Sequence, residues 1–196
     1  MAAVHQIRLF WWCRRLLTRV ACLALAAAFV LEIPAPVRAE PPAEPASPSG
    51  SGLLVPRYVS LKSDRVNMRN GPGTDYPTGW VYRRLGLPLE VIKEFEGWRQ
   101  VRDADGGEGW VLQSFLSGRR TALVLPWERK TSATVPLVPI VASDSANSAV
   151  VANVEAGVIA NLHSCDGRWC KVSVEQYGGY IEQGKLWGVY PGETIK

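Results

Sequence analysis

Residues that commonly carry catalysis are scarce in this sequence of 196 residues. It contains two histidines, and only His163 lies beyond the first 39 residues. A Ser-His-Asp or Cys-His arrangement would therefore depend on that one side chain. The G-x-S-x-G, H-E-x-x-H and Walker patterns are also missing from the sequence. We therefore expect no enzyme activity, no catalytic residues, no metal and no cofactor.

Acidic residues are absent before Glu32, whereas the same stretch contains four arginines. An apolar run, Val20–Leu31, follows the arginines, and a V-R-A tripeptide ends at Ala39. This order of features predicts a cleaved secretory signal peptide at 1–39 and a periplasmic location. The alternative is a retained membrane anchor, although a helix of about twelve residues spans only about 18 Å of a roughly 30 Å hydrocarbon core. Membrane contact is expected only if the leader is retained.

An excess of one charge is also lacking once the leader is removed. The leader holds five arginines and one glutamate, which leaves 17 basic and 17 acidic residues in the remainder. Binding to a polyanion needs a surplus of cations, so we expect no nucleic-acid partner. Residues 57–120 are mildly basic, with eleven Lys or Arg against eight Asp or Glu, and residues 121–196 carry a net charge of −1.

After the leader the sequence shows no helical periodicity, but it contains an internal repeat. The pattern W-x-x-V at 98–101 recurs at 169–172, and G-W-V at 109–111 recurs as G-Y-I at 179–181. The offsets are 71 and 70 residues, and a nearly constant offset indicates two structural repeats. Short β-rich segments between Gly-rich turns predict a small, strongly bent all-β barrel for each copy.

The composition also sets the expected boundaries. Residues 40–52, directly after the leader, consist only of Pro, Ala, Ser, Glu and Gly, and such a segment cannot bury enough apolar area to fold. We expect a signal peptide at 1–39, a Pro/Ala/Ser-rich linker at 40–56, a first barrel at 57–120, a connection at 121–136 and a second, divergent barrel at 137–193.

The segment 66–77, VNMRNGPGTDYP, resembles the opening signature of bacterial SH3-like domains. The later G-W-x-x-V and G-W-V elements resemble the closing strands of the same domain. The longer blocks 86–92, 116–124 and 186–193 are similar to a family of exported SH3-like proteins from α-proteobacteria. The resemblance implies an all-β fold of two tandem SH3-like barrels that recognise peptides or cell-wall material. In the second copy, D-S-A-N at 144–147 replaces the Gly-Pro-Gly turn.

The Gly-Pro-Gly turn has a physical reading of its own. Gly71 and Gly73 bracket Pro72, so we expect a chain reversal with positive φ at glycine and a fixed φ at proline. In the preceding strand, Val66 and Met68 alternate with polar residues and should point into the core.

Aromatic side chains near this turn are the candidate ligand-binding residues. The full candidate set is Arg69, Tyr76, Trp80, Trp98 and Trp110. Trp98 and Val101 are three residues apart on one strand, so they point to opposite faces, and Trp98 should lie near the surface. The alternative is that these rings cap the open ends of the barrel, since aromatic side chains serve both uses.

Two cysteines remain after cleavage of the leader, Cys165 and Cys170, and they flank a short turn. An even number of cysteines in an oxidising compartment predicts a structural disulfide. The rival interpretations are a metal site that includes His163 and a catalytic redox pair. Three nearby ligands leave the fourth zinc ligand missing, and the spacing is not C-x-x-C.

Two functional hypotheses follow. The first is an exported, non-catalytic binding module that recognises peptidoglycan or peptide in a cleft beside the Gly-Pro-Gly loop. The second is a structural or docking module that binds an envelope protein. Fold resemblance alone does not decide between them.

Overall fold

A computed structural model describes residues 50–129 and 134–196 of the chain. These residues belong to one compact unit and form strands and two short 3₁₀ turns, with no α-helix among them. The expected signal peptide and most of the linker lie outside the described residues. Within the described part of the chain, no helix has the length and apolar character needed to cross a membrane.

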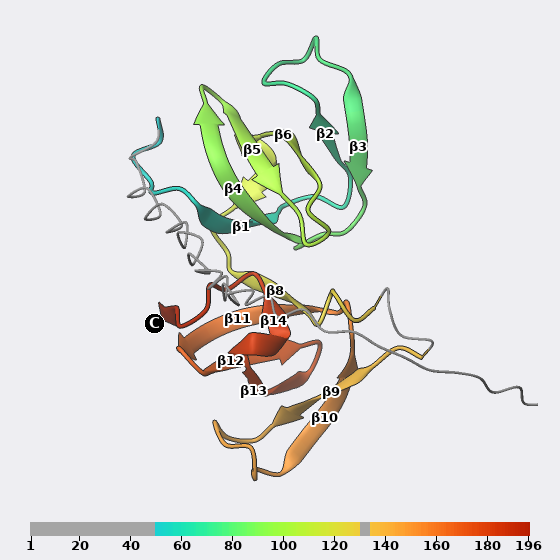
Figure 1. The fold of residues 1–196 in the computed structure, drawn as a ribbon, viewed down its shortest axis with the longest axis vertical. Helices are drawn as coiled ribbons and strands as arrows, with labels where there is room; N and C mark the ends of the chain where they lie inside the picture. Colours follow the sequence, from blue (N-terminus) through green and yellow to red (C-terminus); the bar gives the residue numbers. More distant parts are fainter. Residues whose placement is uncertain (1–49, 130–133) are drawn as a thin grey trace, which may run out of the picture. The chain divides into compact units, whose positions relative to one another are not determined.

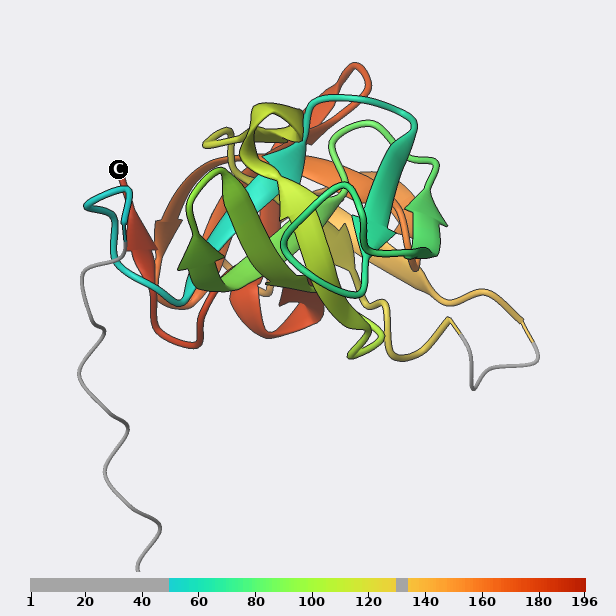
Figure 2. The ribbon, with the colours of Figure 1, turned by 90° about the horizontal axis from the view of Figure 1, so that it is seen from above.

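The first barrel is one antiparallel sheet in the strand order β3-β2-β6-β5-β4-β1-β7, with strands that curve strongly (Figures 1 and 2). Its strands are β1 (Arg57–Leu61), β2 (Val66–Arg69), β3 (Thr78–Tyr82), β4 (Pro88–Phe95), β5 (Trp98–Arg102), β6 (Glu108–Leu112) and β7 (Leu116–Ser117). A 3₁₀ turn, η1 (Gln113–Phe115), joins β6 to β7.

The second barrel repeats this order as β10-β9-β13-β12-β11-β8-β14, with β15 added beside β11. Its strands are β8 (Thr121–Val124), β9 (Leu137–Val141), β10 (Val150–Glu155), β11 (Ile159–Asp166), β12 (Trp169–Val174), β13 (Tyr177–Glu182), β14 (Leu186–Trp187) and β15 (Thr194–Ile195). A second 3₁₀ turn, η2 (Gln183–Lys185), stands where η1 stands in the first barrel. The identical strand order confirms the tandem repeat that the sequence indicated.

The structure corrects one part of the expected layout. Residues 121–136 were expected to be a connection, but Thr121–Val124 forms β8 and pairs with β11 and β14 of the second barrel. The chain between the barrels is therefore the short stretch 118–120, between β7 and β8. The segment that follows Val124 connects two strands of the second barrel.

Each barrel has its own apolar core. In β2, Val66 and Met68 are buried and Asn67 is exposed, which is the alternation that the sequence predicted. The first core gathers Val59, Leu61, Val66, Met68, Tyr82, Leu89, Val91, Val101, Val111 and Leu116. In the second core, Cys165 and Cys170 are cross-strand partners of β11 and β12 and form a disulfide, which confirms the predicted pairing.

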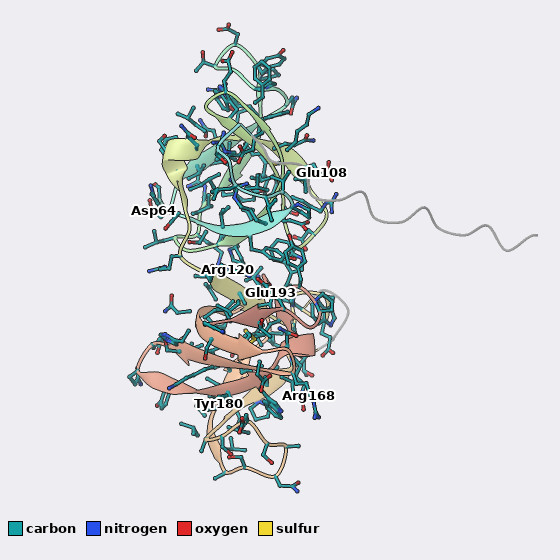
Figure 3. All side chains as sticks on the ribbon, turned by 90° about the vertical axis from the view of Figure 1, so that its left-hand side faces the viewer. Asp64, Glu108, Arg120, Arg168, Tyr180 and Glu193 are labelled. Atoms are coloured by element: carbon teal, nitrogen blue, oxygen red, sulfur yellow. A yellow bond between two sulfur atoms is a disulfide. The ribbon has the colours of Figure 1, made fainter. Side chains whose placement is uncertain are left out.

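The two barrels contact each other through polar groups near the 118–120 connection. The buried Thr121 hydroxyl donates to the carbonyl oxygen of Gly86 at 2.8 Å. Arg120 forms an ion pair with Glu193, with Nη1 and Oε1 2.7 Å apart, and both side chains are labelled in Figure 3. Burial raises the pKa of Glu193, but hydrogen bonds from Arg120 and a backbone N–H outweigh burial and leave the pKa below its ordinary value.

Aromatic rings complete this junction. Tyr58 of the first barrel meets Trp187 edge to face at 5.2 Å between centroids, and Tyr190 at 4.7 Å. The Tyr190 hydroxyl donates to Oε1 of the buried Glu90 at 3.0 Å. Burial and the Glu90 charge raise the pKa of both tyrosines, that of Tyr58 to about 12. The barrels are thus joined by specific side-chain contacts as well as by the chain.

Candidate functional site

The loop between β2 and β3 shapes the candidate site, and Arg69 holds that loop closed. Nη1 of Arg69 donates to the carbonyl oxygens of Thr74 and Tyr76 at 2.9 and 2.6 Å. The backbone N–H of Asn70 donates to the carbonyl oxygen of Pro77 at 3.1 Å and closes the base of the loop. Arg69, expected as a ligand-binding residue, therefore also stabilises the loop between β2 and β3.

The glycines of this loop are needed for a reason that differs from the expected one. Neither Gly71 nor Gly73 has a positive φ. Instead, the ring of Tyr76 lies over Gly71 so closely that a Cβ there would be 2.3 Å from a ring carbon. At Gly73 the corresponding distance is 3.3 Å. Close approach of the ring, rather than a left-handed backbone, is what requires glycine at position 71.

Beside this loop, a cavity of about 250 Å³ opens on the outer side of the β2-β6-β5 strands, and we call it the first groove. Its lining consists of Arg65, Asn67, Arg69, Thr74, Trp98, Leu112 and Phe115. Trp98 faces the groove because Arg99 and Val101, which have the opposite parity on β5, point inward and are buried. Buried Arg99 forms an ion pair with Glu94 at 3.0 Å, so the inward arginine is compensated.

The charge of the first groove is positive. Two of its lining side chains are arginines, Arg65 and Arg69, and none is acidic. Trp98, Leu112 and Phe115 supply apolar surface beside them, and Phe115 is 40% exposed. A groove with this lining can bind a ligand that has carboxylates next to an apolar or planar part.

The structure brings together two of the five predicted site residues, Arg69 and Trp98. Tyr76 is 47% exposed but packs over the loop glycines and does not line the groove. Trp110 is the cross-strand partner of Arg69, half-buried, and outside the lining. Trp80 is 59% exposed and lines a different pocket.

Five lining residues were not anticipated from the sequence: Arg65, Asn67, Thr74, Leu112 and Phe115. Asn67 could have been found from strand parity, because it alternates with buried Val66 and Met68. Leu112 and Phe115 come from the end of β6 and from η1, and only the register of β5 with β6, which pairs Trp98 with Leu112, places them here.

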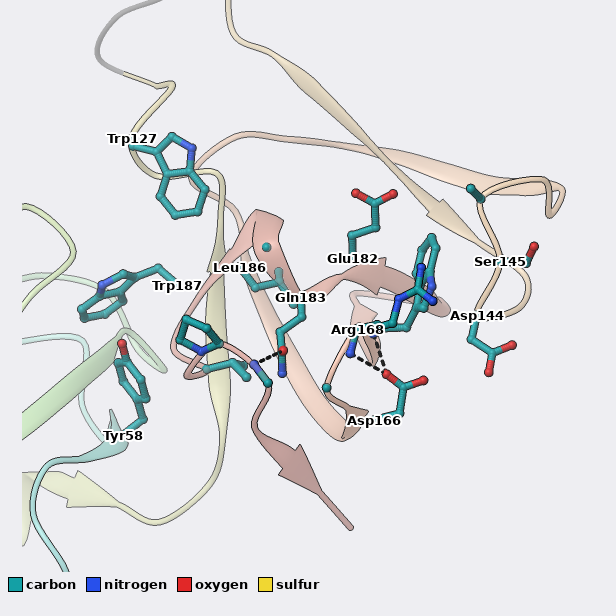
Figure 4. Close-up of a pocket in the computed structure, with 17 residues that line it drawn as sticks. Tyr58, Trp127, Asp144, Ser145, Asp166, Arg168, Glu182, Gln183, Leu186 and Trp187 are labelled. Atoms are coloured by element: carbon teal, nitrogen blue, oxygen red, sulfur yellow. Dashed lines mark hydrogen bonds between the residues drawn. The ribbon is translucent and has the colours of Figure 1, made fainter. Parts of the chain in front are cut away.

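The second barrel has a groove at the related position, a cavity of about 920 Å³ that we call the second groove (Figure 4). Trp169 pairs with Glu182 as Trp98 pairs with Leu112, and the divergent loop contributes Asp144. The groove extends to Tyr58 and Trp187, and Figure 4 shows Asp144 and Arg168 at its opposite end. Its lining combines Arg168 with the acidic residues Asp144, Asp166 and Glu182.

Several polar groups of the second groove already have partners within the barrel. Asp166 accepts hydrogen bonds from the amides of Trp169 and Arg168, both at 2.7 Å, and these bonds lower the pKa of its carboxyl group. Glu182 pairs with Lys185 at 3.0 Å, and the Gln183 side chain accepts from the Gly192 amide at 2.9 Å. The lining of the second groove is therefore net acidic, whereas that of the first has two arginines and no acidic side chain.

Among the described residues, no group of three or more His, Cys, Asp or Glu side chains is placed to hold a metal ion. The exposed His163 ring lies 2.8 Å from the Ser173 hydroxyl, measured from Nε2 to Oγ, and Cys165 and Cys170 are bonded to each other.

A family model described as bacterial SH3 domain matches the chain twice, at residues 62–118 and 135–188. Among solved structures, NlpC2 from Trichomonas vaginalis is 15% identical, with 67% of this chain and 48% of that chain covered and a TM-score of 0.30. NlpC1 from Trichomonas vaginalis is 17% identical, with 72% and 48% covered and a TM-score of 0.30. An NlpC/P60 family protein from Bacillus cereus ATCC 10987 is 10% identical, with 66% and 55% covered and a TM-score of 0.28. The chain thus spans about half the length of these solved structures, and no curated protein matches it significantly.

Proposed function

This chain belongs to the bacterial SH3 domain family, and we propose that it is an exported binding module whose first groove holds an acidic peptide of the cell envelope. The observation that carries the proposal is the chemistry of that groove. Two arginines and the half-buried Trp98 line it, and no acidic side chain does. Guanidinium groups bind carboxylates in planar, hydrogen-bonded pairs, and an indole ring packs against a peptide backbone or an apolar side chain.

Cell-wall stem peptides have the chemistry that this groove suits, since they are short and carry free carboxylates. The basic leader and apolar run at the start of the sequence support a periplasmic location, where such peptides are accessible. Only the first barrel keeps the Gly-Pro-Gly turn, so we propose that it binds the ligand and that the second barrel supports it. The junction around Tyr58 and Glu90 would hold the two barrels together during binding.

A titration with soluble stem peptide tests this proposal by isothermal calorimetry. The free-acid peptide should bind, and the same peptide with amidated carboxyl groups should bind at least about fivefold more weakly, because the charge-assisted hydrogen bonds are lost. Affinity should also fall as salt is raised, since the groove is open to solvent.

Arg65→Gln should weaken binding of the free-acid peptide, because exposed Arg65 lines the groove. Lys171→Gln is the matched control: it removes one positive charge from an exposed position of β12 outside both grooves. Equal affinities for the two variants would contradict the proposal. If the protein binds no stem peptide but retains an envelope protein, the docking function becomes the better account.

A further inference from the structure

A third cavity, of about 580 Å³, lies between the barrels, and we call it the inter-barrel pocket. Its principal lining residues are Trp80, Arg84, Leu87, Leu123, Pro126 and Arg129. The first three come from the first barrel and the last three from the second. Its volume lies in the range of small-molecule binding sites.

Two arginines converge in this pocket on one turn of the second barrel. Nη2 of Arg84 donates to the carbonyl oxygen of Gly157 at 2.9 Å. The side chain of Arg129 runs along the same glycine, because a Cβ there would be 2.7 Å from Cδ of Arg129. Both arginine side chains therefore reach the same residue, Gly157.

Acidic side chains also line the pocket, but the two arginines are not paired with them within the described residues. Neither Arg84 nor Arg129 forms an ion pair among residues 50–129 and 134–196. With Arg83, Asp103 and Asp105 included, the lining has three arginines against two aspartates, a net charge of +1. Asp103 accepts hydrogen bonds from the Tyr82 hydroxyl and from two backbone amides. Partial burial lowers the pKa of Arg84, and the neighbouring charge of Arg129 lowers it further.

Apolar surface lies beside the two arginines. Leu123 and Pro126 are buried, Leu87 is half-buried, and Trp80 is 59% exposed, a large value for an indole ring that lines a cavity. An anion alone would leave this surface exposed to water, whereas a carboxylate attached to an apolar group would cover it and pair with the arginines.

We propose that the inter-barrel pocket is a second binding site, which takes the C-terminal carboxylate of a peptide that ends in an apolar residue. The carboxylate lies between Arg84 and Arg129, and the apolar side chain lies against Leu87, Leu123 and Trp80. Because both barrels line the pocket, the bound peptide holds them in one arrangement. This site is separate from the first groove and does not depend on its function.

The test is an NMR titration of the full chain with N-acetyl-alanyl-leucine, followed by the indole N–H signal of Trp80. The free acid should bind saturably, and its C-terminal amide should bind at least about tenfold more weakly, because the amide cannot pair with the arginines. Acetate, which lacks the apolar side chain, should also bind at least about tenfold more weakly than the peptide.

Arg129→Gln should weaken binding of the free acid at least about fivefold, and Arg84→Gln should do the same; both side chains are exposed, so the fold should survive. The matched control is Lys171→Gln, which removes one positive charge from an exposed position outside the pocket and should leave the affinity unchanged. Equal binding of acid and amide, no saturation, or unchanged affinity in both pocket variants would overturn the inference. Loss of binding in Arg65→Gln alone would place the peptide in the first groove, which refutes this site without refuting the proposed function.

Discussion

Replacement of Gly71 by alanine tests the structural basis of the first groove. The new Cβ would lie 2.3, 2.4 and 2.5 Å from three ring carbons of Tyr76, far inside the roughly 3.5–4.0 Å of normal carbon contacts. The backbone of Gly71 is not in the left-handed region, so alanine adds no strain there. The ring of Tyr76 must therefore move, and it can move toward solvent because it is 47% exposed.

The expected loss of stability is about 1–2 kcal/mol, the lower part of the range for overpacking, since the displaced ring is only half-buried. Gly73→Ala is the matched control: its Cβ would be 3.3 Å from the ring, and a shift of a few tenths of an ångström relieves the contact. We expect that variant to lose less than about 0.5 kcal/mol. Urea denaturation measures both values, with the slope of the transition as a check on the unfolded state.

A double-mutant cycle separates the ring from the backbone as the cause. In a Tyr76→Ala background, Gly71→Ala should be nearly neutral, because no ring remains to be displaced. The loop carbonyls that Arg69 holds would shift with the ring, so Gly71→Ala should also weaken ligand binding in the first groove. An equal loss of stability with and without the Tyr76 ring would refute this reasoning. The backbone conformation, rather than the ring, would then explain why glycine is required at position 71.

Three further predictions concern the junction and the disulfide. Proteolytic cleavage within 130–133 should leave the two fragments associated on native size-exclusion chromatography, because β8 stays paired with β11 and β14; separation without denaturant would contradict the assigned strand order. Cys165 and Cys170 should resist alkylation without reductant, and mass spectrometry that finds two alkylated cysteines would exclude the disulfide. Burial and the Glu90 charge raise the pKa of Tyr58 from 10.0 to about 12, so the stability that neutral Tyr58 contributes is complete below pH 10 and is lost as pH rises toward 12. Tyr58→Phe should therefore lose less stability than the parent protein over that range, and identical pH profiles from thermal unfolding would count against it.

Much of the fold could be predicted from local patterns. The alternation around Val66 and Met68 and the turn between Cys165 and Cys170 reflect neighbours in sequence that are also neighbours in space. The repeat of W-x-x-V indicated that the same local pattern forms twice. Strand β8 escaped prediction because all four of its residues, Thr121–Val124, are buried, and a strand buried on both faces shows no alternation. Its place at the start of the second barrel depends on pairing with β11, about 40 residues later in the chain.

The site was less predictable, for a physical reason. Strand parity placed Trp98 on the outer side correctly, but parity does not say which outward side chains share a groove. Which outward side chains share a groove depends on strand order, because strand order places Arg65 and Phe115 at one cavity and Trp80 at another. The glycine at position 71 was recognised as important, yet its reason lies in a ring five residues away, which turn rules do not describe.

The central claim, that the first groove is the binding site for an acidic peptide, is tested most directly by one comparison of affinities. Trp98→Ala and Trp169→Ala remove half-buried rings from related positions of the two barrels, so their effects on stability should be similar. We predict that Trp98→Ala weakens binding of the free-acid stem peptide by about 1–3 kcal/mol and that Trp169→Ala leaves the affinity unchanged. Unchanged affinity in a folded Trp98→Ala protein, or an equal loss in both variants, would contradict the account.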